Sequence, residues 1–351
     1  MFKVLTLNNI AVEGLRRLPR ERYEVASEIA HPDAILLRSH NMHDMDIPDT
    51  VAAVGRAGAG TNNIPCDMLA HCGVPVFNAP GANANAVKEL MIAGMLLGAR
   101  NLCDARDYVK TLKGTGDELK KAVESGKKQF VGFELPGKTL GVIGLGAIGV
   151  EVANAALDLG MKVVGFDPAI TVRNAWQLSS GVEQEETLDE LFQRADFVTC
   201  HVPLIDATRK MVNADRIALM NDDAVLINFA RGGIVDDAAA LAALDSGKLH
   251  AYVTDFPTPE LIAHPKVIAL PHLGASTGEA ESNCAIMVAE NVKDYLENGN
   301  IRFSVNFPEA RLPRLDAWRI TVANANVPNM VGQISTCLAD AGLNIEDLLN
   351  K

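Results

Sequence analysis

Short apolar runs alternate with stretches of helical spacing along most of the chain. The apolar runs are rich in valine and isoleucine and show little alternation with polar residues, which is typical of strands buried on both faces of a parallel sheet. They predict strands at residues 3–7, 34–37, 52–55, 74–77, 139–143, 162–166, 197–201, 224–228, 251–254 and 267–270. Because the segments between them have helical spacing, we expect an α/β protein built from doubly wound parallel sheets.

Two long helical patterns, at residues 84–110 and 277–298, flank the βα block that begins near residue 139. We interpret them as the connections between two domains, so that the first domain is discontinuous. The expected division is one domain at residues 1–98 and 278–303, a second at residues 99–277, and a third unit at residues 304–351. The third unit contains an irregular linker, a predicted strand at residues 319–323 and a predicted helix at residues 329–341.

The composition is that of a soluble globular protein, with 351 residues, 48% hydrophobic and 22% charged. A net charge of -12 and the lack of a basic block argue against nucleic acid as the main ligand. The cysteines form no CxxC pair and no His/Cys cluster with metal-ligand spacing, so we expect free thiols and no metal site. The chain begins without a signal-peptide pattern and contains no long apolar window, which predicts a cytoplasmic protein.

One glycine-rich turn has the spacing of a dinucleotide site. The segment TLGVIGLGAIGVEVA places Gly144, Gly146 and Gly149 in G-x-G-x-x-G, after a predicted strand and before a helical pattern, and Asp167 ends the next strand. Gly144 allows the tight turn, Gly146 lets the backbone approach a pyrophosphate at the helix N-terminus, and Gly149 permits close helix–strand packing. Asp167 would accept hydrogen bonds from the ribose hydroxyls and repel a 2′-phosphate, which favours NAD over NADP. The alternative is a purely structural βαβ turn.

Three polar side chains follow predicted strands of the same domain. Arg231 comes after residues 224–228, Glu260 after residues 251–254 and His272 after residues 267–270, and doubly wound sheets bind ligands beyond these strand ends. Transfer of a hydride from a secondary alcohol to NAD needs a base, a cation that holds the carboxylate and forming carbonyl, and a carboxylate that orients the base. Each residue alone has a structural alternative, but the three together predict a dehydrogenase site.

The segments LGVIGLGAIG, NFARGGIVD and PHLGAST resemble the D-2-hydroxyacid dehydrogenase family, and the resemblance covers about residues 1–305. It implies two doubly wound domains, Rossmann-like and flavodoxin-like, around a cleft with NAD in one of them. It further implies His272 as acid/base, Glu260 as its partner, Arg231 as the substrate clamp, and a homodimer or higher homo-oligomer. Other cofactor-binding residues implied are Ala147, Ile148, His201, Pro203, Phe229, Ala230, Asp255 and Gly274, of which Asp255 would bind the nicotinamide amide.

The chain departs from the family pattern at Glu260. Asp255 and Glu260 keep the family's spacing, but proline precedes the glutamate, as Pro259, where the family has it afterwards. The segment from Glu260 to His272 is also short. Both departures bear on the role of Glu260.

Within the family, the chain is most similar to members that oxidise 3-phospho-D-glycerate to 3-phosphohydroxypyruvate, the entry to serine biosynthesis. The segment RAGAGTNNI matches their substrate-domain turn, where Ala59, Gly60 and Asn62 or Asn63 would hold a carboxylate. Arg38 and Ser39 lie where those members bind the substrate phosphate. Two alternatives stay open, namely a dehydrogenase for another D-2-hydroxy acid such as glycerate or lactate, and an NAD-sensing corepressor-type binding protein.

The last part of the chain carries a second resemblance. The segment VANANVPNMVGQISTCLADAGLNIEDLLNK is similar to the first βα half of an ACT domain, an α+β unit that senses small molecules. The expected architecture is therefore two doubly wound domains plus the first half of an ACT-type unit.

Overall fold

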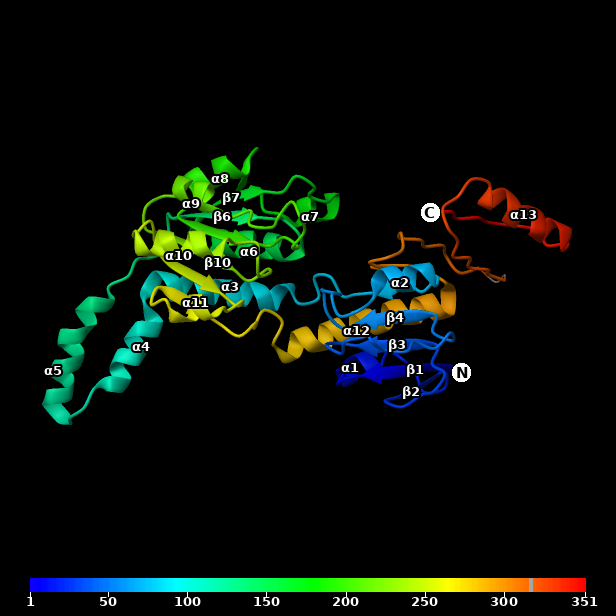
Figure 1. The fold of residues 1–351 in the computed structure, drawn as a ribbon, viewed down its shortest axis with the longest axis horizontal. Coiled ribbons are helices and arrows are strands. Elements are labelled where there is room, and N and C mark those ends of the chain that lie inside the picture. Colours follow the sequence, from blue (N-terminus) through cyan, green and yellow to red (C-terminus); the bar gives the residue numbers. More distant parts are fainter. Residues whose placement is uncertain (316–317) are drawn as a thin grey trace. The chain divides into compact units, whose positions relative to one another are not determined.

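The computed structural model describes residues 1–315 and 318–351. It divides into two compact units, each with its own parallel sheet (Figure 1): unit 1 is Met1–Asn83 with Thr277–Lys351, and unit 2 is Ala84–Ser276. The expected boundary at residue 98 lies inside helix α3, Ala84–Arg100, which belongs to unit 2. Within the described residues, no helix is long and apolar enough to cross a membrane.

Unit 1 contains a five-stranded parallel sheet with the strand order β2-β1-β3-β4-β5, which is the flavodoxin-like order. Its strands are β1 (Phe2–Leu7), β2 (Tyr23–Ala26), β3 (Ala34–Leu37), β4 (Ala53–Arg56) and β5 (Val76–Phe77). Its helices are α1 (Val12–Leu15), α2 (Cys66–His71), α12 (Gly278–Asn298) and α13 (Met330–Asp340).

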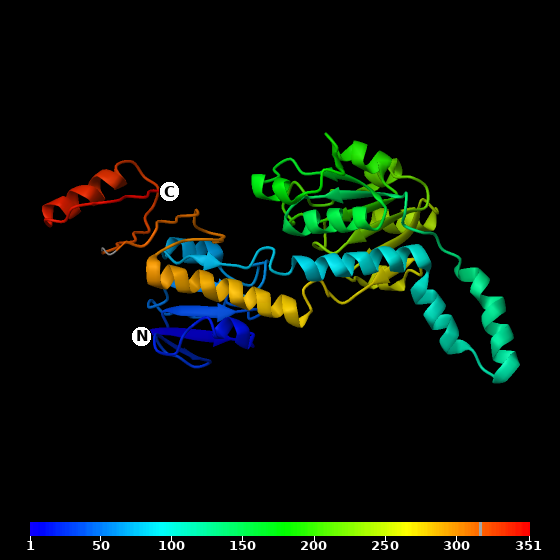
Figure 2. The same ribbon diagram turned by 180° about the vertical axis from the view of Figure 1, so that it is seen from behind.

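Helix α12 completes the core of unit 1, although it comes from the far side of unit 2 in the sequence (Figure 2). Thr277 caps its N-terminus by accepting a hydrogen bond from the Ala280 N–H, and Gly299 ends it with a φ of 66°. A Cβ at Gly55 of β4 would lie 2.8 Å from Val288 and Val292 side-chain atoms of α12. The helix therefore packs directly onto β4.

Unit 2 contains a seven-stranded parallel sheet with the order β12-β11-β10-β9-β6-β7-β8. Six of these strands follow the Rossmann order, and β12 is added at one edge. The strands are β6 (Thr139–Ile143), β7 (Lys162–Phe166), β8 (Val182–Gln184), β9 (Phe197–Cys200), β10 (Ala224–Asn228), β11 (Leu249–Thr254) and β12 (Val267–Ala269). Every strand predicted before residue 300 is present, with ends shifted by at most two residues, so the doubly wound fold is confirmed.

Helices cover both faces of the sheet of unit 2. Helix α3 and helix α6 (Ala147–Asp158) pack on one face, while α8 (Leu188–Arg194), α9 (Ala214–Leu219) and α10 (Asp237–Asp245) pack on the other. The remaining short helices are α7 (Val172–Gln177), α11 (Pro259–Ala263) and the 3-10 turn η1 (Lys127–Phe130). The sheet is therefore buried on both sides, as its apolar strands predict.

The long helix expected at residues 84–110 is two helices. Asn101 has a φ of 49°, a left-handed conformation that asparagine tolerates better than most residues. It separates α3 from α4 (Leu102–Thr111), and α4 then runs antiparallel to α5 (Gly116–Gly126) (Figure 1). The Tyr108 hydroxyl donates a hydrogen bond of 3.0 Å to the Ala122 carbonyl, which ties the two helices together.

The predicted helix at residues 329–341 is present as α13, but the predicted strand at residues 319–323 is wrong. Its apolar residues Ile320 and Val322 are 61% and 50% exposed, and no neighbouring strand pairs with them in the described chain. The Arg319 guanidinium instead donates hydrogen bonds to the Leu312 and Pro313 carbonyls. The expected half of an ACT-type unit is therefore not confirmed.

Candidate functional site

The glycine-rich turn between β6 and α6 has the conformation that a dinucleotide site needs. Gly144 has a φ of 91°, and a Cβ there would lie 2.7 Å from the His201 carbonyl oxygen. A Cβ at Gly149 would lie 1.9 Å from the Gly144 carbonyl oxygen, so α6 packs against the turn itself. Gly146 differs, because a Cβ there would meet no atom within 4 Å. The turn is closed beneath Gly144 and Gly149 and open above Gly146.

The open side of the turn coincides with the N-terminus of α6. Gly146 is the N-cap, and no side chain caps the N–H groups of the first turn. The N–H groups of Ala147, Ile148 and Gly149 have no partner within the helix, and they lie at the positive end of its dipole. An anionic pyrophosphate fits this position.

Asp167 is held in place at the carboxyl end of β7. Its Oδ2 accepts a hydrogen bond of 2.8 Å from the Leu145 N–H, and its Oδ1 accepts one of 2.8 Å from the Ala169 N–H. The carboxylate is therefore fixed beside the glycine-rich turn. This geometry suits the hydroxyls of an adenosine ribose attached to the pyrophosphate.

His201 and Phe229, both expected near the cofactor, contribute differently. Burial lowers the pKa of His201 to about 4, and its Nε2 lies 3.1 Å from the Thr199 hydroxyl, so the imidazole is neutral at pH 7. The Phe229 side chain is 5% exposed and packs against Gly94 of α3. Only the backbone of Phe229 is therefore available to a ligand.

Asp255 supplies an unsatisfied acceptor beyond the end of β11. It is 1% exposed, its Oδ2 accepts a 3.3 Å hydrogen bond from the Gly274 N–H, and its Oδ1 is buried without a partner. Burial raises the pKa of Asp255, while His272 and the surrounding N–H groups oppose this rise. An amide donor such as that of nicotinamide would satisfy the orphaned oxygen, so the residues present fit NAD.

His272 lies on the turn that follows β12, and the turn fixes its direction. Its φ is 49°, and its N–H donates a hydrogen bond of 3.0 Å to the Asp255 carbonyl. Its ring is centred 4.9 Å from the ring of Phe256 and is exposed. A non-glycine residue in the left-handed region is uncommon, and such backbone strain clusters at functional sites.

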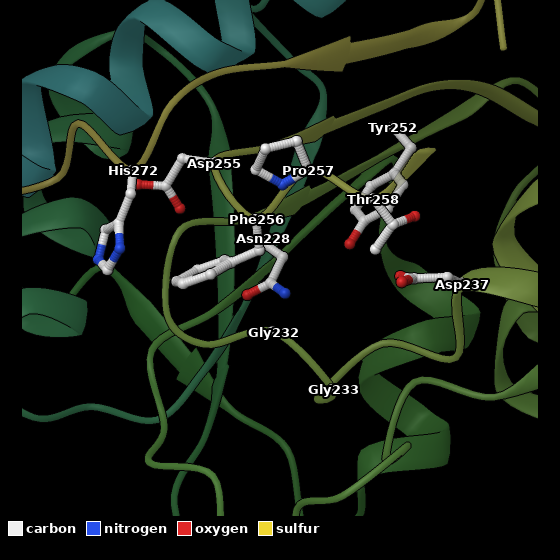
Figure 3. A pocket seen from close by; sticks show the side chains of 10 residues that line it. All are labelled: Asn228, Gly232, Gly233, Asp237, Tyr252, Asp255, Phe256, Pro257, Thr258 and His272. Atoms are coloured by element: carbon white, nitrogen blue, oxygen red, sulfur yellow. The ribbon is translucent and has the colours of Figure 1, made fainter. Parts of the chain in front are cut away.

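A pocket of about 350 Å³ opens beside His272 at the carboxyl ends of β10 and β11 (Figure 3). Asp255 and Phe256 line the His272 side of it, and Asp237 and Thr258 lie together on the opposite side. The other lining residues are Asn228, Gly232, Gly233, Tyr252 and Pro257. The pocket belongs wholly to unit 2.

The loop that carries Arg231 lines this pocket, but the structure does not bring Glu260 to His272. The Asn228 side chain holds the loop by donating a 2.9 Å hydrogen bond to the Arg231 carbonyl, and the exposed Arg231 guanidinium donates to the Ala230 carbonyl at 2.7 Å. Within the described residues, Glu260 forms no hydrogen bond or ion pair with His272.

The position of Glu260 has a local cause. Thr258 caps α11 and Pro259 takes its first position, so Glu260 lies in the first turn of a short helix and is exposed. Its charge acts on Asp237, whose pKa is raised first by burial and further by Asp236 and Glu260. Asp255, in contrast, lies close enough to His272 for the imidazole to oppose the rise in the Asp255 pKa.

Unit 1 brings two arginines together at its strand ends. Arg38 follows β3 and Arg56 ends β4, and the two strands pair with Leu37 opposite Arg56. The Arg56 Nε donates a hydrogen bond of 3.1 Å to the Arg38 carbonyl. Arg56 was not among the predicted substrate residues, although its place at the end of a strand next to β3 is visible in the sequence.

The remaining predicted substrate residues surround these arginines. Asn63, rather than Asn62, donates to the Arg38 carbonyl, at 3.2 Å, while Asn62 is exposed. The Asn78 side chain donates a 2.6 Å hydrogen bond to the Ala59 carbonyl, which fixes the turn that contains Gly60. Ser39 is exposed at the end of β3. Of these two supporting residues, Asn63 was one of the two asparagines offered by the sequence, and Asn78 was not singled out.

Comparison with known proteins agrees with this geometry. Residues 92–274 match the family described as D-isomer specific 2-hydroxyacid dehydrogenase, NAD binding domain. The chain is 36% identical to D-3-phosphoglycerate dehydrogenase of Methanocaldococcus jannaschii, over 93% of this chain and 61% of that protein. It is 37% identical to hydroxypyruvate reductase of Thermotoga maritima, over 78% of this chain and 87% of that protein.

Solved structures show the same fold. The NAD+-bound 3-phosphoglycerate dehydrogenase of Entamoeba histolytica superposes with a TM-score of 0.67 at 26% identity, covering 87% of this chain and 99% of that one. An NADPH-dependent glyoxylate/hydroxypyruvate reductase of Sinorhizobium meliloti has a TM-score of 0.73 at 24% identity, covering 89% of this chain and all of that one. The chain spans 61% of the Methanocaldococcus jannaschii relative and 59% of the D-3-phosphoglycerate dehydrogenase of Bacillus subtilis.

Proposed function

The chain belongs to the D-isomer-specific 2-hydroxyacid dehydrogenase family, and we propose that it oxidises 3-phospho-D-glycerate to 3-phosphohydroxypyruvate with NAD. In this proposal it catalyses the entry step of serine biosynthesis. The observation that carries the choice of substrate is the pair of arginines at the ends of β3 and β4 in unit 1.

The substrate has a 2-hydroxycarboxylate at one end and a phosphate at the other. His272 and Arg231 of unit 2 are an acid–base group and a cation suited to the hydroxyl and the carboxylate. Arg38 and Arg56 of unit 1 are suited to the phosphate, because guanidinium groups bind phosphate oxygens through charge-assisted hydrogen bonds. A plain hydroxy acid such as glycerate offers no partner for the second pair.

In the proposed mechanism, His272 accepts the proton of the C2 hydroxyl as the substrate is oxidised. Arg231 holds the carboxylate and stabilises the negative charge that develops on the carbonyl oxygen. Asp255 would orient the nicotinamide through its unpaired Oδ1, and the N-terminus of α6 would hold the pyrophosphate. Bound NAD supplies the hydride acceptor. Glu260 stays a proposed partner of His272, in a role that needs a different side-chain position.

A specific observation favours a second candidate, oxidation of an unphosphorylated hydroxy acid such as glycerate. The chain is 37% identical to the Thermotoga maritima hydroxypyruvate reductase, as high an identity as the 36% to the Methanocaldococcus jannaschii D-3-phosphoglycerate dehydrogenase. The test is the rate of NADH formation with 3-phosphoglycerate, D-glycerate and D-lactate. The proposal expects the highest kcat/KM with 3-phosphoglycerate, and a higher value for glycerate would refute it. No turnover with any of the three would favour a binding protein.

The Arg38→Ala variant tests the phosphate assignment directly. A charge-assisted hydrogen bond contributes about 1.5–3 kcal/mol, so the KM for 3-phosphoglycerate is expected to rise roughly ten- to a hundredfold. The kcat/KM for glycerate should stay nearly unchanged. Arg17→Ala is the matched control, because Arg17 is an exposed arginine of the same unit whose ion pair is with Glu290. Equal losses on both substrates would mean that Arg38 only supports the fold.

A further inference from the structure

The phosphate site proposed above already contains a carboxylate. Glu281 lies in the first turn of α12, and its Oε1 is 2.6 Å from the Arg38 Nη1. The Glu281 side chain is 45% exposed and the Arg38 side chain 36%, so the ion pair lies at the surface of unit 1 and is open to solvent. An anion from solution that approaches Arg38 therefore meets a guanidinium group that is already paired with Glu281.

The neighbouring residue Cys284 lies close enough to both arginines and to Glu281 to feel all three charges. Cys284 is buried one turn further along α12. Its pKa is raised chiefly by burial, lowered by Arg56 and Arg38, and raised by Glu281. All three charges thus act on one sulfur atom. The cluster contains two guanidinium groups and one carboxylate, and the carboxylate offsets part of the positive charge that a phosphate would meet.

We propose that Glu281 is the resident counter-ion of the phosphate site: it holds Arg38 in the absence of ligand and is displaced by the substrate phosphate. This inference rests on the proposed function, because it needs Arg38 to bind phosphate. A doubly charged phosphate attracts the guanidinium more strongly than a single carboxylate does, so the exchange is favourable. Breaking the Arg38–Glu281 ion pair costs free energy, and this weakens the binding of every anion at the site. The weaker binding limits occupation by inorganic phosphate and aids release of the phosphorylated product.

The informative variant is Glu281→Gln, because glutamine loses the charge but keeps a side-chain oxygen that accepts a hydrogen bond from Arg38. We expect the KM for 3-phosphoglycerate to fall three- to tenfold, and the inhibition constant of inorganic phosphate to fall by a similar factor. The kcat/KM for glycerate should not change. The full chain should also show a rise in melting temperature at lower concentrations of inorganic phosphate than the wild type needs.

Two further variants separate charge from position. Glu279→Gln is the matched control, because Glu279 lies in the same turn of α12, carries the same charge and has no ion pair in the described structure, so it should behave as the wild type. Glu281→Gln added to Arg38→Ala should have no further effect on KM, since the interaction it removes needs both partners.

Each outcome bears on a different claim. An unchanged or higher KM for 3-phosphoglycerate in Glu281→Gln, with a raised KM in Arg38→Ala, overturns the counter-ion role and leaves the proposed function standing. The same decrease in Glu279→Gln would mean a general charge effect and would also overturn the role. If neither Arg38→Ala nor Glu281→Gln changes the kcat/KM for 3-phosphoglycerate relative to that for glycerate, both the inference and the phosphate assignment fail.

Discussion

Replacing Gly146 by alanine should separate cofactor binding from folding. The structure leaves open space around a Cβ at this position, and Gly146 does not adopt a left-handed φ, since its value as the N-cap of α6 is −71°. Alanine is a poorer N-cap than glycine by about 0.5–1 kcal/mol, while it restricts the unfolded chain by about 0.4–1 kcal/mol. These two effects nearly cancel, so the free energy of unfolding should change by less than about 1 kcal/mol, or roughly 2–4 °C in melting temperature for a unit of this size.

The same methyl group would stand where the pyrophosphate approaches the helix N-terminus. Hydrogen bonds from N–H groups to a charged acceptor contribute about 1.5–3 kcal/mol each. Loss of one such bond raises the dissociation constant of NAD roughly ten- to a hundredfold. The assay is an NAD titration followed by calorimetry, with thermal melting of the ligand-free protein measured alongside.

Gly149→Ala is the matched comparison within the same motif. A Cβ at Gly149 would lie 1.9 Å from the Gly144 carbonyl oxygen, so this variant should lower both the melting temperature and NAD affinity. The reasoning is refuted if Gly146→Ala binds NAD within twofold of the wild type, or if it loses as much stability as Gly149→Ala.

Three further predictions concern other residues of unit 2. His272→Ala should lower turnover by about 10²–10⁴-fold, the usual contribution of a general acid–base group, with NAD affinity retained in a titration; near-normal turnover would remove His272 from the chemistry. Asp167→Ser should narrow the preference for NAD over NADP in coenzyme kinetics, and equal use of both by the wild type would contradict the assignment. Burial lowers the pKa of His201 from 6.5 to about 4, so the unfolded state takes up the proton first as the pH falls, and stability is lost between those values. Between pH 7.5 and 4.5 the free energy of unfolding should fall by about 2–3 kcal/mol because of His201. Chemical unfolding of His201→Gln should not show this contribution. The same pH dependence of stability in both proteins would count against the prediction.

The buried strands were predictable because each is a short run of apolar residues between helical segments. The two strands that the pattern missed, β2 and β8, lie at the edges of their sheets and contain polar residues in the sequences YEVA and VEQ. The segment RITVA shows the reverse error, because its composition suits a strand but no neighbouring strand is available to pair with it in the described chain. Local composition predicts well whether a segment is buried. It predicts whether a strand pairs with a neighbouring strand only where that strand is also buried.

In the candidate site, too, features set by local sequence were predictable, and contacts between distant segments were not. The glycine-rich turn and His272 occupy positions in the fold that their local sequence dictates, so their motifs predict where they lie. Glu260 keeps the family's spacing, but the cap at Thr258 and Pro259 starts a short helix that leaves it exposed in the first turn, with no hydrogen bond to His272 in the described residues. Arg56 and Glu281 lie beside Arg38 only because β3, β4 and α12 pack together. No local sequence pattern predicts such a contact between distant segments. The oligomeric state and the cytoplasmic location stay predictions.

The division of unit 1 into two segments has a consequence for biosynthesis. The strands of its sheet leave the ribosome first, but α12, which covers Gly55 of β4, follows only after residues 84–276. At synthesis rates of about 5–20 residues per second, those residues take roughly 10–40 s to emerge. Throughout that interval the apolar face that later receives Val288 and Val292 is uncovered, whereas unit 2 is continuous and can fold as it is made. The nascent chain therefore exposes an apolar sheet surface, which chaperones can bind, while its second half is translated.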